Sequence, residues 1–130
     1  MQICELATPA VLIERSRLTS NLSKMQAAVN ARGIRLRPHA KTHKSPEVAR
    51  MQLAAGATGI TLAKTSEAEV FASLGFDDVF LGYPIFGADK ARRLLALSDR
   101  MRLTVGADSA EGARSITDLG MTPSLVRVFR

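Results

Sequence analysis

Residues 37–44 combine three lysine or arginine side chains with two histidines in eight positions. The stretch follows a short apolar run and precedes a helix start signal, which predicts that it lies where a strand passes into a loop. In α/β proteins the carboxyl ends of strands carry the chemistry. Because strand side chains alternate, we expect Arg37, His39 and Lys41 to share one face. Pro38 lacks a backbone donor, so the strand is expected to end there.

Lys41 is the candidate nucleophile of this stretch. A lysine attacks a carbonyl only as the neutral amine, and the neighbouring Arg37, His39 and Lys44 disfavour the ammonium form. This pattern predicts a Schiff-base lysine. A solvated basic loop accounts for the same spacing and stays as the alternative.

His39 and His43 are four residues apart, which on a helix would be a metal-ligand spacing. Pro38 argues against a helix, and no carboxylate or cysteine stands nearby in the sequence, so no metal site is predicted here. Tyr83 follows a later expected strand, which would place it on the same rim as Lys41 in a barrel. Contact with substrate and packing against the loop are equally compatible with that position.

Apolar runs and turn residues predict six strands separated by five helices. The strands are expected at residues 8–13, 34–37, 59–63, 78–81, 102–107 and 125–129. The helices are expected at residues 15–31, 46–55, 66–74, 88–97 and 109–119.

Several residue patterns support the helix boundaries. Leu18, Leu22, Met25 and Val29 would form one apolar stripe on the first helix. Ser45 is expected to cap the second helix, with Pro46 at its first position. Two capping boxes are predicted, at Ser66 with Glu69 and at Asp108 with Glu111. The buried face of the third helix is expected at Val70, Phe71 and Leu74.

Repeated βα units predict an α/β domain with a parallel sheet. Such a sheet either opens into a small doubly wound, flavodoxin-like domain or closes into a (β/α)8 TIM barrel. A barrel needs about 250 residues, so the 130 residues could form only its amino-terminal part. Length does not decide between the two.

The spelling Arg-Pro-His-Ala-Lys-Thr-His-Lys at residues 37–44 resembles the cofactor-lysine segment of the D-threonine aldolase and D-serine dehydratase family. These are fold-type III pyridoxal phosphate enzymes related to alanine racemases. The flanking residues 8–13, 45–49, 53–57 and 64–69 are similar to the family as well. The resemblance extends from about residue 8 to about residue 116.

The resemblance implies the barrel, of which residues 1–130 would be one amino-terminal portion, without the rest of the barrel and a carboxyl-terminal β domain. It implies that Lys41 carries pyridoxal 5'-phosphate as a Schiff base. By their positions, His39, His43, Arg37 and Tyr83 are then expected as cofactor contacts, although Arg37 could instead only tune Lys41. The expected activity is that of an aldolase, dehydratase or racemase acting on small D-amino acids.

The resemblance also sets expectations for what the chain lacks. The phosphate site and the ligands of a divalent metal would come from later segments, so the fragment alone is expected to be inactive. The ending at residues 125–130 departs from the family, which suggests a truncated product. A homodimer is compatible with the family.

Two other functions account for part of the sequence. A non-catalytic pyridoxal phosphate homeostasis or carrier protein shares the barrel and a lysine, but the His-Ala-Lys-Thr-His spelling argues against it. The net charge of +6 would suit nucleic acid or a phosphate-bearing cofactor. No nucleic-acid partner is expected, because aromatic residues make up only 5% of the chain and the basic residues cluster at one strand end.

No membrane span or signal peptide is evident, and the single cysteine, Cys4, has no internal disulfide partner. These features predict a cytoplasmic protein.

Overall fold

A four-stranded parallel sheet forms the centre of the computed structural model, which describes residues 2–118, 120 and 126–128. Its strands run in sequential order: β1 (Ile60–Leu62), β2 (Asp78–Leu81), β3 (Arg102–Ala107) and β4 (Val126–Val128). A doubly wound sheet would reverse its strand order at a switch point. The sequential order therefore confirms the barrel-type arrangement and not the flavodoxin-like alternative.

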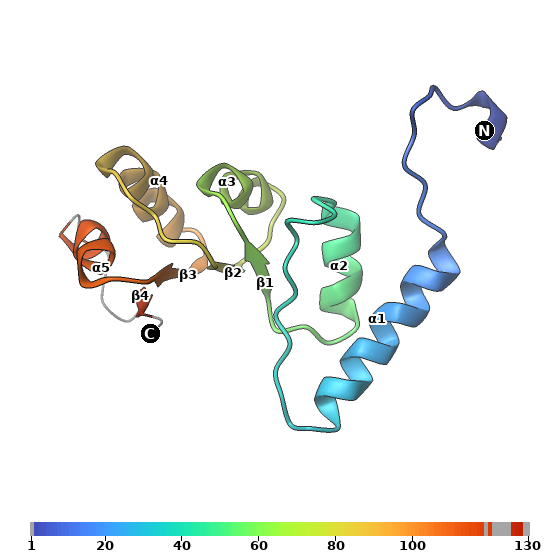
Figure 1. Ribbon diagram of the computed structural model, residues 1–130, viewed down its shortest axis with the longest axis horizontal. Coiled ribbons are helices and arrows are strands. Elements are labelled where there is room, and N and C mark those ends of the chain that lie inside the picture. The colour runs from blue at the N-terminus through green and yellow to red at the C-terminus, as the bar shows by residue number, and fades with distance from the viewer. Residues whose placement is uncertain (1, 119, 121–125, 129–130) are drawn as a thin grey trace.

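Four helices connect and cover the strands: α2 (Pro46–Ala54), α3 (Thr65–Ser73), α4 (Ala88–Ser98) and α5 (Ala110–Thr117). Figure 1 shows α3, α4 and α5 along one side of the sheet. The strand register aligns Leu62, Leu81 and Val105, which are buried on the side that the helices cover.

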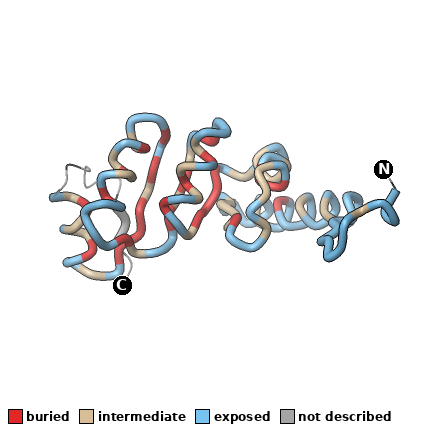
Figure 2. The backbone as a smooth tube through the Cα atoms, turned by 90° about the horizontal axis from the view of Figure 1, so that it is seen from above, coloured by how far each residue is buried: buried red, intermediate tan, exposed pale blue. Residues whose placement is uncertain are grey.

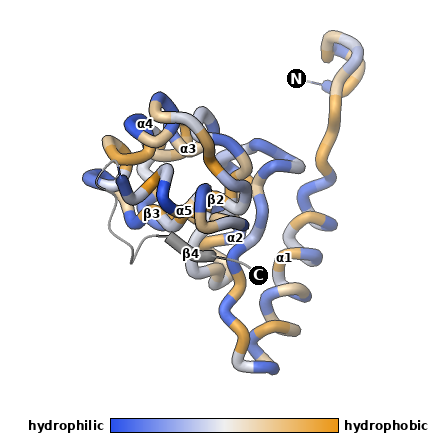
Figure 3. Tube along the Cα trace, turned by 60° about the vertical axis from the view of Figure 1, so that its left-hand side comes forward, coloured by the Kyte–Doolittle hydropathy of each residue, from blue (hydrophilic) through white to orange (hydrophobic). Residues whose placement is uncertain are grey.

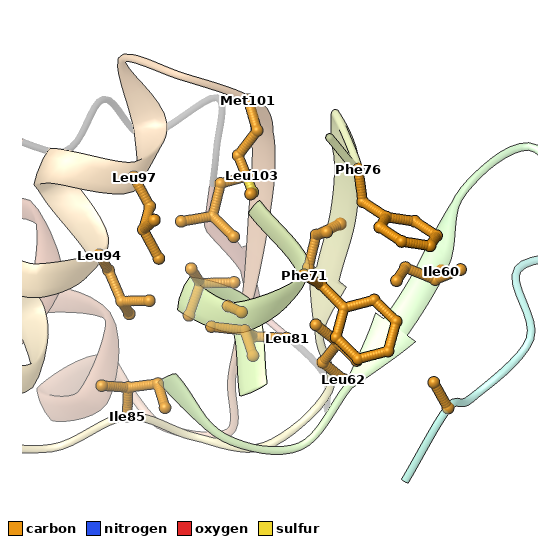
Figure 4. Close-up of a cluster of buried hydrophobic side chains, with 14 of the residues drawn as sticks. Ile60, Leu62, Phe71, Phe76, Leu81, Ile85, Leu94, Leu97, Met101 and Leu103 are labelled. Carbon is orange, nitrogen blue, oxygen red and sulfur yellow. The ribbon is translucent and has the colours of Figure 1, made fainter. Parts of the chain in front are cut away.

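The hydrophobic core lies between these strands and helices. Leu94 and Leu97 of α4 point at the strands, as Figure 4 shows, and Phe71 of α3 packs beside Phe76 with ring centroids 4.9 Å apart. Each fully buried leucine or phenylalanine contributes about 1.5–3 kcal/mol relative to an exposed one. This packing fixes the strand ends that carry the candidate site.

The strand expected at residues 34–37 is not formed. Residues 36–40 instead run beside β1 and are hydrogen-bonded to it. The Thr58 and Thr61 N–H groups donate to the carbonyl oxygens of Leu36 and Pro38 at 2.9 and 2.7 Å. Ala40 N–H donates to Thr61 at 2.8 Å. Pro38 has no N–H to donate, so the ladder is interrupted, and only an isolated parallel bridge between His39 and Thr61 is formed.

The strand expected at residues 8–13 is wrong for this structure. Thr8 and Pro9 form a bend, the rest of the segment belongs to no sheet, and Val11 is 95% exposed. A strand needs a partner for its backbone groups, and none of the described residues pairs with this segment. Figure 3 shows it as a hydrophobic stretch that stands away from the body of the molecule.

The first long helix, α1 (Arg15–Asn30), lies at the edge of the molecule and contacts α2 (Figures 1 and 2). Leu18, Leu22 and Val29 of the predicted stripe are half-buried, whereas Met25 is exposed. Gln26 is the one buried residue of this helix. A short 3-10 helix, η1 (Ile3–Glu5), precedes it. No helix among the described residues has the length and apolar character needed to cross a bilayer.

Helix α2 begins as predicted, with Ser45 Oγ accepting from Val48 N–H at 3.3 Å and Pro46 at the first position. The capping box expected at Ser66 and Glu69 is wrong. Glu67 instead accepts from the backbone at the start of α3, and Glu69 pairs with Arg93 of α4. The cap of α3 is Lys64, two residues before the expected cap at Ser66.

This shift also changes the buried face of α3. Thr65, Ala68 and Phe71 are buried, whereas Val70 and Leu74 are exposed. These three buried residues repeat at helical spacing, and small side chains at positions 65 and 68 let the helix approach the sheet closely.

The capping box predicted at Asp108 and Glu111 is wrong as well. Ser109 is the cap of α5, and its Oγ accepts from Gly112 N–H at 3.0 Å. The expected end of this helix at residue 119 and the outer residues 125 and 129 of the last expected strand lie outside the described residues, but β4 lies within that strand.

Candidate functional site

Lys41 and Tyr83 meet on the rim formed by the carboxyl ends of the strands. Lys41 lies in the turn that follows the segment paired with β1, and Tyr83 lies two residues after β2. Lys41 Nζ is 3.3 Å from the Tyr83 hydroxyl oxygen and 5.3 Å from the centre of its ring. The structure therefore brings together two residues that the sequence placed on one rim.

An open pocket of about 410 Å³ lies at this rim. Its lining consists of Lys41, Lys44, Ala63, Lys64, Glu67 and Tyr83. A primary amine, a phenol, a carboxylate and two further ammonium groups thus face one volume. The set fits an aldehyde that carries negative charge, because Lys41 supplies an amine and the other lysines supply positive charge.

Glu67 is the pocket residue that the sequence reasoning missed. Its side chain is 13% exposed, and Oε2 accepts from the N–H groups of Ala63 and Lys64 at 3.0 and 3.3 Å. Oε1 lies 3.5 Å from Lys44 Nζ. Burial alone would raise the pKa of Glu67, but the hydrogen bonds from Ala63 and Lys44 outweigh it and lower the pKa below its ordinary value. The signal in the sequence was its position three residues after Lys64, which is the spacing of a capping box.

His39 supports the backbone of the lysine. Its Nδ1 accepts from Lys41 N–H at 3.2 Å. Burial lowers the pKa of His39, and the positive charge of Lys41 lowers it further. The ring is therefore neutral near pH 7 and carries its proton on Nε2, which is buried without a hydrogen-bond partner among the described residues.

His43 holds the start of α2. Its Nδ1 accepts from Ser45 N–H at 3.0 Å, and burial lowers its pKa. His43 does not line the pocket beside Lys41. Within the part of the chain that the structure describes, His, Cys, Asp and Glu side chains form no group of three that could hold a metal ion.

Arg37 lies at the opposite end of the strands from Lys41. Its Nη1 donates to Asp78 Oδ1 at 2.7 Å and to the Asp78 carbonyl at 3.3 Å, at the beginning of β2. A Cβ at Gly59 would overlap the Arg37 guanidinium, so glycine at that position leaves the space for this ion pair. The structure therefore does not bring Arg37 to the pocket, and a cofactor contact of Arg37 stays a prediction.

Comparisons with known proteins agree with this arrangement. Residues 13–125 match the family described as "Alanine racemase, N-terminal domain". The chain is 34% identical over 115 residues to a D-threonine aldolase of Arthrobacter sp, covering 88% of this chain and 30% of that protein. It is 40% identical over 120 residues to the D-threo-3-hydroxyaspartate dehydratase of Delftia sp. (strain HT23), again covering 88% and 30%.

The solved structures include a D-threonine aldolase from Filomicrobium marinum, with a TM-score of 0.86 and 33% identity. The match covers 90% of this chain and 32% of that structure. The chain thus spans about a third of the length of the relatives it matches. The resemblance expected from residues 37–44 is confirmed, and the chain belongs to the alanine racemase N-terminal domain family.

Proposed function

We propose that this chain supplies the lysine-bearing part of a pyridoxal phosphate-dependent enzyme that acts on small D-amino acids as an aldolase or dehydratase. The observation that carries the proposal is Lys41 Nζ beside the Tyr83 hydroxyl on a pocket at the carboxyl ends of the strands. The names of the relatives support the substrate class.

Lys41 would hold the cofactor through Nζ and, once released by an incoming amino acid, would accept or return a proton at the α-carbon. The bound cofactor supplies an electron sink for the charge that develops at that carbon. Tyr83 orients the Lys41 side chain through its ring and hydroxyl group. Lys44 and Lys64 supply positive charge at the pocket wall.

The two histidines act through the backbone in this proposal. His39 fixes Lys41 N–H, and His43 fixes the start of α2 directly after the lysine turn. For Arg37 the proposed role is to hold the paired segment in place at its beginning, because its guanidinium is bound to Asp78. None of these three groups needs to touch the reacting atoms.

Reduction with borohydride after incubation with pyridoxal phosphate, followed by peptide mapping, tests the proposal. We expect the cofactor to be fixed on Lys41 at least about tenfold more than on Lys24, an exposed lysine of α1. A Lys41→Arg variant should lose this label and leave the background on Lys24 unchanged.

Labelling spread evenly over the lysines would contradict the proposal. A second assay separates an enzyme from a carrier. A longer protein that contains this chain and labels at Lys41 should release aldehyde from D-threonine or ammonia from D-serine, whereas a carrier of the same length would bind the cofactor without turnover. Residues 1–130 alone are expected to label without turnover, so the assay needs the longer protein.

A further inference from the structure

Lys44 ends the turn that carries Lys41, and its backbone has an unusual conformation. Its φ is 49°, which makes it the one non-glycine residue with a left-handed backbone among the residues that the structure describes. A side chain in this region crowds its own backbone, so a lysine adopts it at a cost in free energy. Such a conformation persists only where surrounding contacts hold it, and it is frequent at functional sites.

The two ends of the lysine turn are joined by the backbone. Ala40 is 1% exposed, and its N–H donates to the Thr61 carbonyl of β1 at 2.8 Å. At the other end Lys44 N–H donates to the Ala40 carbonyl at 2.8 Å, which closes the turn over residues 41–43. Any residue other than proline supplies such an N–H, and glycine would adopt this φ without a steric cost. The backbone by itself therefore does not explain why a lysine stands at position 44.

The side chain of Lys44 reaches the beginning of α3. Its Nζ lies 3.5 Å from Oε1 of Glu67, whose Oε2 accepts the backbone hydrogen bonds from Ala63 and Lys64. The Glu67 side chain is 13% exposed and firmly placed, whereas the Lys44 side chain is 62% exposed. An ion pair with one partner so exposed contributes little to overall stability. Its effect is local, because it joins the end of the lysine turn to α3 at the wall of the pocket beside Lys41.

We propose that Lys44 is a positioning residue for Lys41 and that it acts through its ion pair with Glu67. The pair holds the left-handed end of the turn against α3. Because Ala40 is anchored to β1, a rotation at position 44 would be taken up by residues 41–43 and would move Lys41 Nζ away from Tyr83. This role rests on the function proposed for Lys41 and gives Lys44 a task besides its charge.

Glu67→Gln separates positioning from electrostatic attraction, because the two predict opposite results. The amide retains an acceptor for the Ala63 and Lys64 N–H groups but breaks the ion pair. If Lys44 acted only through its positive charge, removal of the Glu67 charge would strengthen the attraction of pyridoxal phosphate and speed the labelling of Lys41. Positioning predicts that labelling becomes slower, by about fivefold.

Variants at position 44 make the same test from the other partner. Lys44→Met removes the charge at similar length and should slow the labelling of Lys41 by about fivefold, whereas Lys44→Arg should restore most of the rate. The double variant Lys44→Met, Glu67→Gln should be no slower than the slower single variant, since both changes remove one interaction. Lys24→Met on α1 is the charge-matched control and should label at the parent rate.

The rates are measured by borohydride reduction and peptide mapping, with pyridoxal phosphate and with pyridoxal, which lacks the phosphate charge. We expect losses of equal size with both aldehydes. Faster labelling in Glu67→Gln, or a loss in Lys44→Met that appears with pyridoxal phosphate and not with pyridoxal, would overturn the proposal. Urea denaturation should show closely similar midpoints for Lys44→Met and the parent, because the Lys44 side chain is exposed.

Hydrogen exchange tests the ion pair without the cofactor. The Lys44 amide is bound to the Ala40 carbonyl, so its protection in Glu67→Gln should fall by about fivefold if the pair holds the turn. Unchanged protection together with unchanged labelling would overturn the proposal. An absence of Lys41 labelling in the parent, with the loss of protection still present, would refute the function proposed for Lys41 and leave the hold of the ion pair on the turn established.

Discussion

Lys41 is held in place by two contacts of different kinds. Its backbone N–H donates to His39 Nδ1, and its Nζ lies against the Tyr83 hydroxyl and ring. A lysine side chain otherwise has many rotamers, and fixing them costs up to about 2 kcal/mol. Because these contacts limit that freedom before a ligand arrives, Lys41 is presented to the pocket in a defined direction.

Replacement of Tyr83 should slow the reaction of Lys41 with pyridoxal phosphate. Tyr83→Phe keeps the ring contact and is expected to slow reductive labelling by about twofold, whereas Tyr83→Ala removes both contacts and should slow it by about tenfold. Stopped-flow absorbance at the cofactor band measures the rate.

Phe86→Ala is the matched control for Tyr83, because both residues are 50% exposed and Phe86 is not among the residues that line the pocket beside Lys41. Its labelling rate should equal that of the parent protein. An unchanged rate in Tyr83→Ala would show that Tyr83 only packs against the loop.

The two histidines make folding stability depend on pH. Burial lowers the pKa of both His39 and His43 in the folded chain, although the carboxylate of Glu67 partly opposes this at His39. The unfolded chain, with its ordinary pKa near 6.5, therefore binds more protons than the folded chain below that pH. Stability is fully present above about pH 6.5 and is lost progressively as the pH falls from there through the lower pKa values of the folded histidines.

Thermal unfolding between pH 7.5 and 5.5 measures this effect, and the midpoint should fall with pH. The carboxylates of Glu67 and Glu69 do not titrate in this window, because hydrogen bonds and ion pairs hold their pKa values below the ordinary value of 4.5. A double variant His39→Gln, His43→Gln should show a flatter dependence. A midpoint that stays constant or rises on acidification would contradict the prediction.

Residue types near Lys41 were largely readable from the sequence, but their partners were not. The motif indicated Lys41, His39 and His43, and Tyr83 was placed by its strand end. Arg37 belongs to the same motif, yet it binds Asp78 at the other end of the strands. Strand alternation predicts a face, whereas position along the strand decides which end of the barrel a side chain reaches.

Helix beginnings are the elements that shape the pocket wall. The start of α3 is fixed by Glu67. Its carboxylate accepts two backbone hydrogen bonds and forms an ion pair with Lys44. The start of α2 is fixed by Ser45 and by His43. Both helices therefore begin at residues that also border the lysine turn.

Removal of the Glu67 carboxylate should destabilise the fold. Glu67→Ala leaves the Ala63 and Lys64 N–H groups without this acceptor and is expected to lower the free energy of unfolding by about 1–2 kcal/mol. Glu67→Gln retains an acceptor and should cost less. Urea denaturation measures both variants.

Glu111→Ala is the control for Glu67, because Glu111 is an exposed acid in the first turn of α5. Its effect should stay within about 0.5 kcal/mol. If the free energies of unfolding of Glu67→Ala and Glu111→Ala were equal, the Glu67 cap would not be what holds α3.

Capping was the weakest part of the sequence prediction for the helices. Ser66 with Glu69 and Asp108 with Glu111 satisfy the spacing of a capping box, but Glu67 and Ser109 perform the task. Several polar residues in succession offer alternative caps, and the choice depends on which small side chains can face the sheet. Ser45 was predicted correctly because Pro46 fixes the helix start.

At the scale of the molecule, α1 is attached to the rest of the chain more weakly than the other long helices are. The clustered buried hydrophobic residues of the described chain come from the strands, from α2 to α5 and from their connections, and α1 contributes none. Figure 2 shows α1 mostly exposed, in contrast to the strands. The contact with α2 is its main attachment.

Hydrogen exchange should reveal this difference. Amides within α1 are expected to exchange at least about tenfold faster than those of β2 and β3, because local opening of α1 exposes little core. Exchange measured by mass spectrometry on peptides from α1, α4 and β3 tests the expectation. Helix α4 is the control, since Leu94 and Leu97 anchor it; equal protection of α1 and α4 would contradict the prediction.

The sequence by itself determined the βα order of the chain and the identity of the lysine turn, because hydrophobic periodicity and a contiguous motif are local properties. Tertiary structure decided the strand order, the exposed state of residues 8–13, and the pairings across the rim. Lys41 and Tyr83 are 42 residues apart and Arg37 and Asp78 are 41 apart. Such contacts exist only after neighbouring parallel strands align in register, and no local pattern encodes that alignment.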